Sequence, residues 1–203
     1  MINDLDATLA RLLRSNLPPE WADQVQISFA APDSQFPPQS VALPAIDLFL
    51  YDVRENLELR SNDLSTQRRS DGTALQRRPP VRVDFSYLVT AWPSESVAGP
   101  WEDEHRLLGE VMRALLQHRT IPQELLAGSL ALQETPLPVS SLQAGRLHSP
   151  GEFWQAMGGK PKVALHYTVT ASVETDAQVV PLVIDKHLGV GILRHEVPQP
   201  AAG

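Results

Sequence analysis

Two strand-like runs, residues 46–60 and 81–92, constrain the fold more than any other part of this chain. The first run carries consecutive apolar residues from Leu48 to Tyr51, so both of its alternating faces are apolar, as is typical of a strand inside a covered sheet. In the second run, apolar residues share one face with a period of two: Val81, Val83, Phe85, Tyr87, Val89 and Ala91. The polar segment 61–80, which contains the turn signal Asp71-Gly72, is predicted to be a mobile loop between two antiparallel strands.

Helices are predicted before and after this pair of strands. A stripe of leucines indicates a helix over residues 4–16 with Asp4 as its N-cap, and a wider apolar stripe indicates a helix over residues 101–118. Ser149 and Glu152 form an S-x-x-E capping box, which predicts a short helix that begins at Pro150.

Further strands are predicted over residues 24–29, 163–173 and 179–185, and Pro181 favours an edge position for the last of them. Strands that follow one another, with helices interspersed, predict an α+β fold in which helices cover a mixed, mainly antiparallel sheet. We expect one domain over residues 1–185 and a partly disordered C-terminal tail over residues 186–203.

The composition excludes several classes of protein. The 203 residues carry a net charge of −7, and an acidic chain repels a phosphate backbone, so we expect no nucleic-acid partner. The absence of cysteine excludes disulfides, thiolate metal sites and a cysteine nucleophile, and it fits a reducing cytosol. No apolar run approaches the roughly 20 residues of a membrane span, and the N-terminus does not resemble a secretory signal, so no membrane insertion is expected.

No motif indicates catalysis or a bound cofactor. The histidines lack metal-ligand spacing, and the acidic residues of segment 103–105 are explained by their place near a helix N-terminus. The Gly-x-Gly at 189–191 and the Gly-Lys at 159–160 are fragments of phosphate-binding motifs, and Ser129 lacks the second glycine of a nucleophile elbow. We therefore predict a non-enzymatic protein with no catalytic residue, no cofactor and no metal.

Charged residues around the two central strands indicate contact surfaces instead. Arginine makes planar, bidentate contacts to carboxylates, which suits interfaces, and Arg82 adds to an arginine cluster around the segment 61–80. A solvated loop explains these arginines equally well, and polar residues at the end of the first strand could simply satisfy loop backbone groups. The candidate interface residues are Arg54, Glu55, Asn56, Glu58, Arg60, Arg68, Arg69, Arg77 and Arg78.

The ordered segments LFLYDVRENLELRSN, RRPPVRVDFSYLVTAWP and DEHRLLGEVMRALLQH resemble a known family. It is the cap, or tail-terminator, family of bacterial contractile injection systems, which are phage-tail-like particles; its domain was formerly one of unknown function. The start, MINDLDATLARLLR, and the later GEFWQAMGGKPKVALHYTVTASV follow the same pattern, so the resemblance spans about residues 2–185. It implies a tail-terminator-like α/β subunit that forms a ring, hexameric by this resemblance, at the tail end away from the baseplate.

We compare three functions for this chain. The resemblance implies a structural ring that contacts the inner tube and the last sheath layer and ends their polymerisation, with edge-strand pairing as one mode of contact. The alternatives are a soluble adaptor or assembly chaperone for tail components, and a hydrolase with a dispersed site. Stoichiometric presence in purified particles separates the first two, and saturable turnover would support the third. We expect assembly in the cytoplasm into a particle that is later released or membrane-associated.

Overall fold

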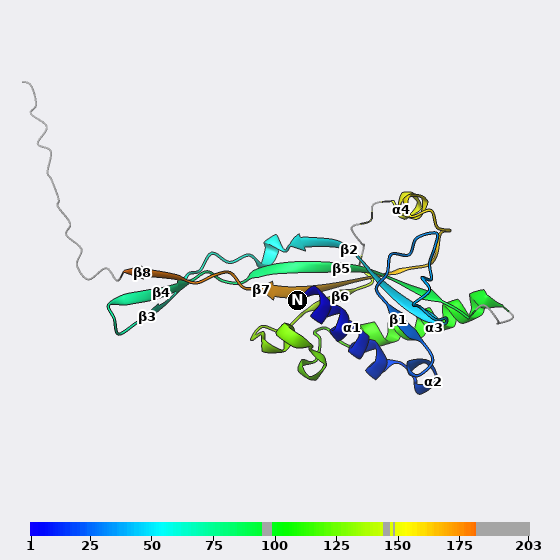
Figure 1. Ribbon diagram of the computed structural model, residues 1–203, viewed down its shortest axis with the longest axis horizontal. Helices are drawn as coiled ribbons and strands as arrows, with labels where there is room; N and C mark the ends of the chain where they lie inside the picture. The colour runs from blue at the N-terminus through cyan, green and yellow to red at the C-terminus, as the bar shows by residue number, and fades with distance from the viewer. Residues whose placement is uncertain (95–98, 144–146, 148, 182–203) are drawn as a thin grey trace, which may run out of the picture. The chain divides into compact units, whose positions relative to one another are not determined.

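The computed structural model describes residues 1–94, 99–143, 147 and 149–181 (Figure 1). The chain divides into two compact units. Unit 1 comprises Met1–Asn62 and Pro79–Thr175, and unit 2 comprises Asp63–Arg78 with the segment that begins at Asp176. The predicted domain boundary at residue 185 and the predicted tail over 186–203 lie outside the described residues.

Unit 1 is built on a five-stranded sheet in the order β1-β2-β5-β7-β6. β1 runs parallel to β2, and the other neighbouring pairs are antiparallel. The predicted α+β fold with a mixed, mainly antiparallel sheet is therefore confirmed. The strands are β1 (Gln26–Ser28), β2 (Ala45–Glu55), β5 (Val81–Trp92), β6 (Val139–Ser141) and β7 (Leu165–Val173).

One face of this sheet is apolar and is covered by α1 and α3, which lie on the same side of it in Figure 1. Leucines from both helices pack against the inward residues of β5 and β7, and each fully buried leucine contributes about 1.5–3 kcal/mol. The helices are α1 (Ile2–Asn16), α2 (Pro19–Ala22), α3 (Pro100–Leu116) and α4 (Pro150–Ala156), with 3₁₀ turns η1 (Leu57–Leu59), η2 (Gln123–Leu125) and η3 (Gly128–Leu132).

In the described part of the chain, the opposite face of the sheet is covered at one end. There Phe36 packs on Trp92 with a ring-centroid distance of 4.3 Å, and Phe153 of α4 lies 6.2 Å from Phe49 of β2. The Ser149 hydroxyl accepts a hydrogen bond from the Glu152 N–H at 3.3 Å, so the predicted cap of α4 is confirmed. The remaining part of this face carries polar side chains.

The predicted start of the first helix is wrong. α1 begins at Ile2 with Met1 as its N-cap, and no side chain caps its first turn. Asp4 lies inside the helix, and its carboxylate accepts hydrogen bonds from the N–H and the hydroxyl of Ser129. The apolar stripe extends to Ile2, so the helix continues one turn beyond the residue that local capping chemistry favours.

Unit 2 is a three-stranded antiparallel sheet in the order β3-β4-β8. Its strands are β3 (Ser65–Arg68), β4 (Thr73–Arg77) and β8 (Gln178–Pro181). The predicted mobile loop over residues 61–80 is therefore wrong for most of its length, because β3 and β4 form a hairpin around Gly72, whose φ is +78°. Pro181 lies in an edge strand, as predicted, and its strand pairs with β4 of this second sheet.

Candidate interface groove

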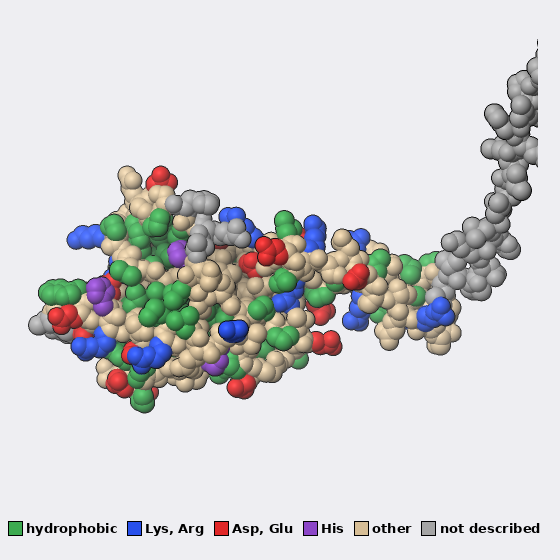
Figure 2. Space-filling view, turned by 180° about the vertical axis from the view of Figure 1, so that it is seen from behind, with side chains coloured by type: hydrophobic (Ala, Val, Ile, Leu, Met, Phe, Trp, Pro, Cys, Tyr) green, Lys and Arg blue, Asp and Glu red, His purple; other side chains and the backbone are tan. Residues whose placement is uncertain are grey.

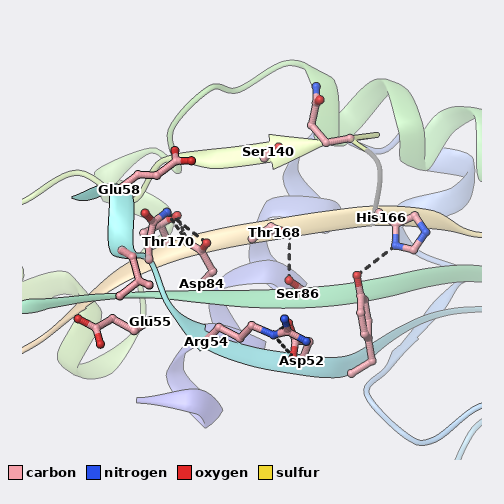
Figure 3. A pocket seen from close by; sticks show the side chains of 14 residues that line it. Asp52, Arg54, Glu55, Glu58, Asp84, Ser86, Ser140, His166, Thr168 and Thr170 are labelled. Carbon is pink, nitrogen blue, oxygen red and sulfur yellow. Dashed lines mark hydrogen bonds and ion pairs between the residues drawn. The ribbon is translucent and has the colours of Figure 1, made fainter. Parts of the chain in front are cut away.

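A polar groove crosses the uncovered part of the five-stranded sheet. Asp84 and Ser86 of β5 and Thr168 and Thr170 of β7 point into it from its floor (Figure 3). These residues alternate with the buried Phe85 and Tyr167 neighbours that face α1 and α3, so the same period of two builds the core and the groove. The groove has a volume of about 640 Å³, and the other residues that line it are Tyr51, Asp52, Arg54, Glu55, Asn56, Leu57, Glu58, Ser140, Gln143 and His166.

Asn56 and Asp84 organise one end of the groove. The Asn56 amide donates to both carboxylate oxygens of Asp84 at 3.1 Å, and the Thr170 hydroxyl donates to Asp84 at 2.6 Å. The side-chain oxygen Oδ1 of Asn56 also accepts a hydrogen bond from the Leu59 N–H at 3.1 Å and thereby caps η1. Asn56 therefore satisfies loop backbone groups, which is one of the two roles that the sequence left open for this polar cluster.

A β-bulge shapes the other end of the groove. The register between β2 and β5 shifts between Leu50 and Asp52, so Tyr51 is the extra residue. The Tyr51 hydroxyl lies 3.2 Å from Nδ1 of His166, and the two rings meet edge to face. Partial burial lowers the pKa of His166, so the imidazole is neutral near pH 7, and in the tautomer with the proton on Nε2 its Nδ1 accepts a hydrogen bond from the tyrosine hydroxyl.

The groove is acidic. Four carboxylates line it, from Asp52, Glu55, Glu58 and Asp84, against the single guanidinium of Arg54. Arg54 pairs with Asp52 at 2.8 Å, whereas Glu58 has no ion pair or hydrogen bond among the described residues. The excess of negative charge means that this surface attracts cationic groups and repels anionic ones.

The nine predicted interface residues are divided between the two units. Arg54, Glu55, Asn56 and Glu58 line the groove, and Arg60 pairs with Glu55 at 3.2 Å. The other four arginines belong to unit 2, where all of them are exposed and where basic side chains reach the surface (Figure 2): Arg68, Arg69, Arg77 and Arg78. The arginines predicted to cluster around one loop are thus divided between the two units, and their role as an interface stays a prediction.

Arg82 belongs to neither group. Its guanidinium donates to the Ser172 hydroxyl at 2.7 Å and to the Pro136 carbonyl oxygen at 3.4 Å. This arginine therefore ties β5 to β7 and to the segment before β6, and its role is internal.

Sequence reasoning missed the floor of the groove. Asp84, Ser86, Thr168 and Thr170 stand at the polar positions between the apolar residues of two predicted strands. The sequence did contain a signal for this floor, namely the polar positions that alternate with the apolar ones. Two strands that are neighbours in a sheet place such side chains on one surface. What the sequence lacked was the pairing of β5 with β7, which are separated by more than 70 residues.

Among the described residues, the groove does not join a serine or threonine hydroxyl to an imidazole by a hydrogen bond. No group of three His, Asp or Glu side chains in the described part of the chain could hold a metal ion. No helix in the described ranges is long and apolar enough to cross a membrane. The one imidazole in the groove contacts a tyrosine, and the hydroxyls of Ser86 and Thr168 contact each other at 3.2 Å.

The fold defines the class of protein. It is shared with the sheath/tube terminator of the PVC extracellular contractile injection system in its extended state, with a TM-score of 0.64 and 24% identity over 99% of this chain and 64% of that one. It is also shared with the tube-terminating cap of the anti-feeding prophage, with a TM-score of 0.58 and 23% identity over 95% of this chain and 61% of that one. The molecule is thus an α+β protein with the fold of these terminator caps.

The chain belongs to the Pvc16 N-terminal domain family, whose sequence model matches residues 4–184. This match confirms the resemblance drawn from the sequence segments. The chain spans 64% and 61% of the length of the two solved structures, so it corresponds to less than two thirds of either. No curated protein matches the chain.

Proposed function

We propose that this protein is a structural cap that ends the inner tube and sheath of a contractile injection system at the end away from the baseplate. The observation that carries the proposal is the family match over residues 4–184, supported by a fold shared with two terminator caps. Mechanistically, one face of a ring of caps binds the last tube or sheath layer as the next layer would. The other face lacks a binding surface for a further layer. Polymerisation therefore stops at the cap.

The ring is proposed to be a homo-hexamer. Copies that meet through two different surfaces, head to tail, close into a ring when the rotation per subunit divides a full turn. The groove of unit 1 and the arginine-bearing surface of unit 2 are two such different surfaces on one chain. An exposed apolar stripe on α3 offers further area for tube, sheath or ring contacts, formed by Trp101, Met112 and Leu116.

The four arginines of unit 2 are proposed to contact acidic surfaces of a neighbouring cap, tube or sheath subunit. They are exposed and lie on a small sheet, so they are available to a partner. Each exposed ion pair contributes only about 0.2–1 kcal/mol. Repetition around a ring multiplies such contacts through avidity, which makes a small local gain decisive for assembly.

The groove chemistry favours this structural role over the hydrolase. Among the described residues, no serine or threonine hydroxyl of the groove is hydrogen-bonded to the imidazole of His166, which is engaged by Tyr51. The adaptor or assembly-chaperone function makes the same contacts without joining the particle, so it is the main alternative.

Purified particles test the proposal. A cap is expected in stoichiometric amount at one end of each particle, where cryo-electron microscopy should show it as a ring, and deletion of the gene should give tubes and sheaths of irregular length. An adaptor would be required for normal yield but absent from intact particles. Particles of normal length from the deletion strain would contradict the cap function, and particles of both normal length and normal yield would contradict both functions.

A further inference from the structure

One long edge of the five-stranded sheet is left without a neighbouring strand in the described part of the chain. On one side, β2 pairs with β5 along almost its whole length. On the other side, β1 pairs only with Ala45–Asp47 of β2. The Asn56 N–H donates to the Arg82 carbonyl oxygen, so backbone groups at Asn56 face β5. Because inward and outward backbone groups alternate along a strand, those of Val53 and Glu55 face outward.

This edge is accessible and acidic. The side chain of Val53 is 47% exposed, although it belongs to a strand with a buried beginning. The carboxylates of Asp52, Glu55 and Glu58 lie on or directly after the uncovered part of β2; Arg54 and Arg60 pair with the first two, which leaves Glu58 as the excess negative charge. Outward N–H and C=O groups accept an added strand, and the negative charge selects a strand that carries cationic side chains.

Unit 2 has the complementary properties. All four residues of its edge strand β3 are exposed, and Arg68 and Arg69 stand at the end of this strand, with Arg77 and Arg78 at the end of β4. Across β3, β4 and β8, Ala74 is the one residue of the described strands that is buried. So small a buried surface makes a three-stranded sheet marginal by itself, and a partner surface would stabilise it.

We propose that β3 of one copy pairs with the uncovered edge of β2 in the next copy, with the arginines of unit 2 against the carboxylates of the groove. The inference rests on the proposed ring and names its contact. We call unit 2 the arm. Each copy contributes its own arm to one neighbour and binds the arm of the other neighbour, so the contact is head to tail and a ring of copies can close.

Charge reversal tests the contact in the full chain. The groove-reversed variant is Glu55→Lys with Glu58→Lys, and the arm-reversed variant is Arg68→Glu with Arg69→Glu. The matched control, Arg14→Glu with Arg119→Glu, changes two exposed arginines of unit 1. Native mass spectrometry and sedimentation measure self-association of each purified protein and of a 1:1 mixture of the two reversed variants, and circular dichroism checks that each is folded.

Each reversed variant alone juxtaposes like charges, so its self-association should fall by about tenfold or more, while the control behaves as the wild type. The mixture restores opposite charges at every contact, so it should assemble as well as the wild type and contain both chains in equal amounts. A mixture as weak as its components overturns the inference.

Two further results would also overturn it, and they leave the proposed function standing. Reversed variants that associate like the wild type show that the ring closes through another surface. A groove-reversed variant that keeps ring formation but loses tube or sheath protein shows that the acidic edge receives a basic segment of that protein. Failure of the cap function itself is read separately, from normal particle length in the deletion strain.

Discussion

Tyr87 and Tyr167 lie opposite each other on β5 and β7 and are both fully buried, but among the described residues the hydroxyl of Tyr87 has a partner and that of Tyr167 has none. The Tyr87 O–H donates to the Asp6 carboxylate of α1 at 3.0 Å, whereas no described residue hydrogen-bonds the Tyr167 hydroxyl. Burial beside this carboxylate raises the pKa of Tyr87, so its proton is retained for the contact.

This difference predicts opposite effects for one substitution at two positions. Tyr87→Phe should lower the free energy of unfolding by roughly 1–3 kcal/mol, because Asp6 loses a buried donor. Tyr167→Phe should be neutral or slightly stabilising, because it removes a hydroxyl that is buried away from water without a hydrogen bond from a described residue. Denaturant unfolding measures both, and equal losses at the two positions would contradict the hydrogen-bond assignment.

Asp47 makes the stability of the protein depend on pH. It is fully buried beside Ser28, and no hydrogen bond of good geometry reaches its oxygens from described residues. Burial raises its pKa from 3.8 to about 7, and the nearby Ser28 hydroxyl and Ala30 N–H offset only part of that effect. The folded state therefore holds a proton that the unfolded state has released, so stability is full below about pH 4 and falls as the pH rises through about 7.

Asp47→Asn should remove this dependence. The variant should gain up to about 4 kcal/mol relative to the wild type above pH 7 and little near pH 4, since each unit of pKa shift corresponds to about 1.4 kcal/mol. Melting temperatures across this range measure the effect. His166, whose pKa is lowered, contributes a slope of the opposite sign at lower pH, and it remains in both proteins. Parallel pH curves for the two proteins would show that Asp47 is charged when folded.

Gly128 permits the contact between Asp4 and Ser129. Its φ is +52°, and a Cβ at this position would overlap the Asp4 carboxylate. Gly128→Ala should therefore lower the free energy of unfolding by roughly 1–3 kcal/mol. Gly109→Ala is the matched control, because Gly109 lies within α3 with open space around it. The control should raise stability by about 0.5–1 kcal/mol in the same denaturant titration, and a loss at both sites would point to helix packing instead.

The arginines of unit 2 should matter for assembly and little for folding. Changing Arg68, Arg69, Arg77 and Arg78 to Glu leaves the core of unit 1 untouched, so its melting temperature should stay close to that of the wild type. Tubes and sheaths assembled with this variant should vary in length, which electron microscopy measures. A folded variant that gives normal length and normal caps would make these residues a solvated hairpin surface.

The main sheet could be predicted because its strands carry their own signal. Val81–Trp92 appears with the predicted bounds, since its period of two is set by residues that all reach one core. The groove was only half predicted: Arg54, Glu55, Asn56 and Glu58 follow a visible strand end, but Asp84 depends on a contact between β5 and β7 that sequence spacing does not reveal. β3 could not be predicted, because Ser65–Arg68 has no apolar alternation and forms through pairing with β4.

The place of β8 in the chain has a consequence for synthesis. β7 ends at Val173 and completes the five-stranded sheet, and β8 follows it as the third strand of the small sheet. A growing chain leaves the ribosome from its N-terminus, so the whole core of unit 1 is available for burial before β4 meets β8. Until then the β3-β4 hairpin is only two-stranded, which is marginal in water. A nascent copy therefore folds unit 1 first and unit 2 last. Unfinished chains lack a complete unit 2, so they are poor partners for copies that have already been released.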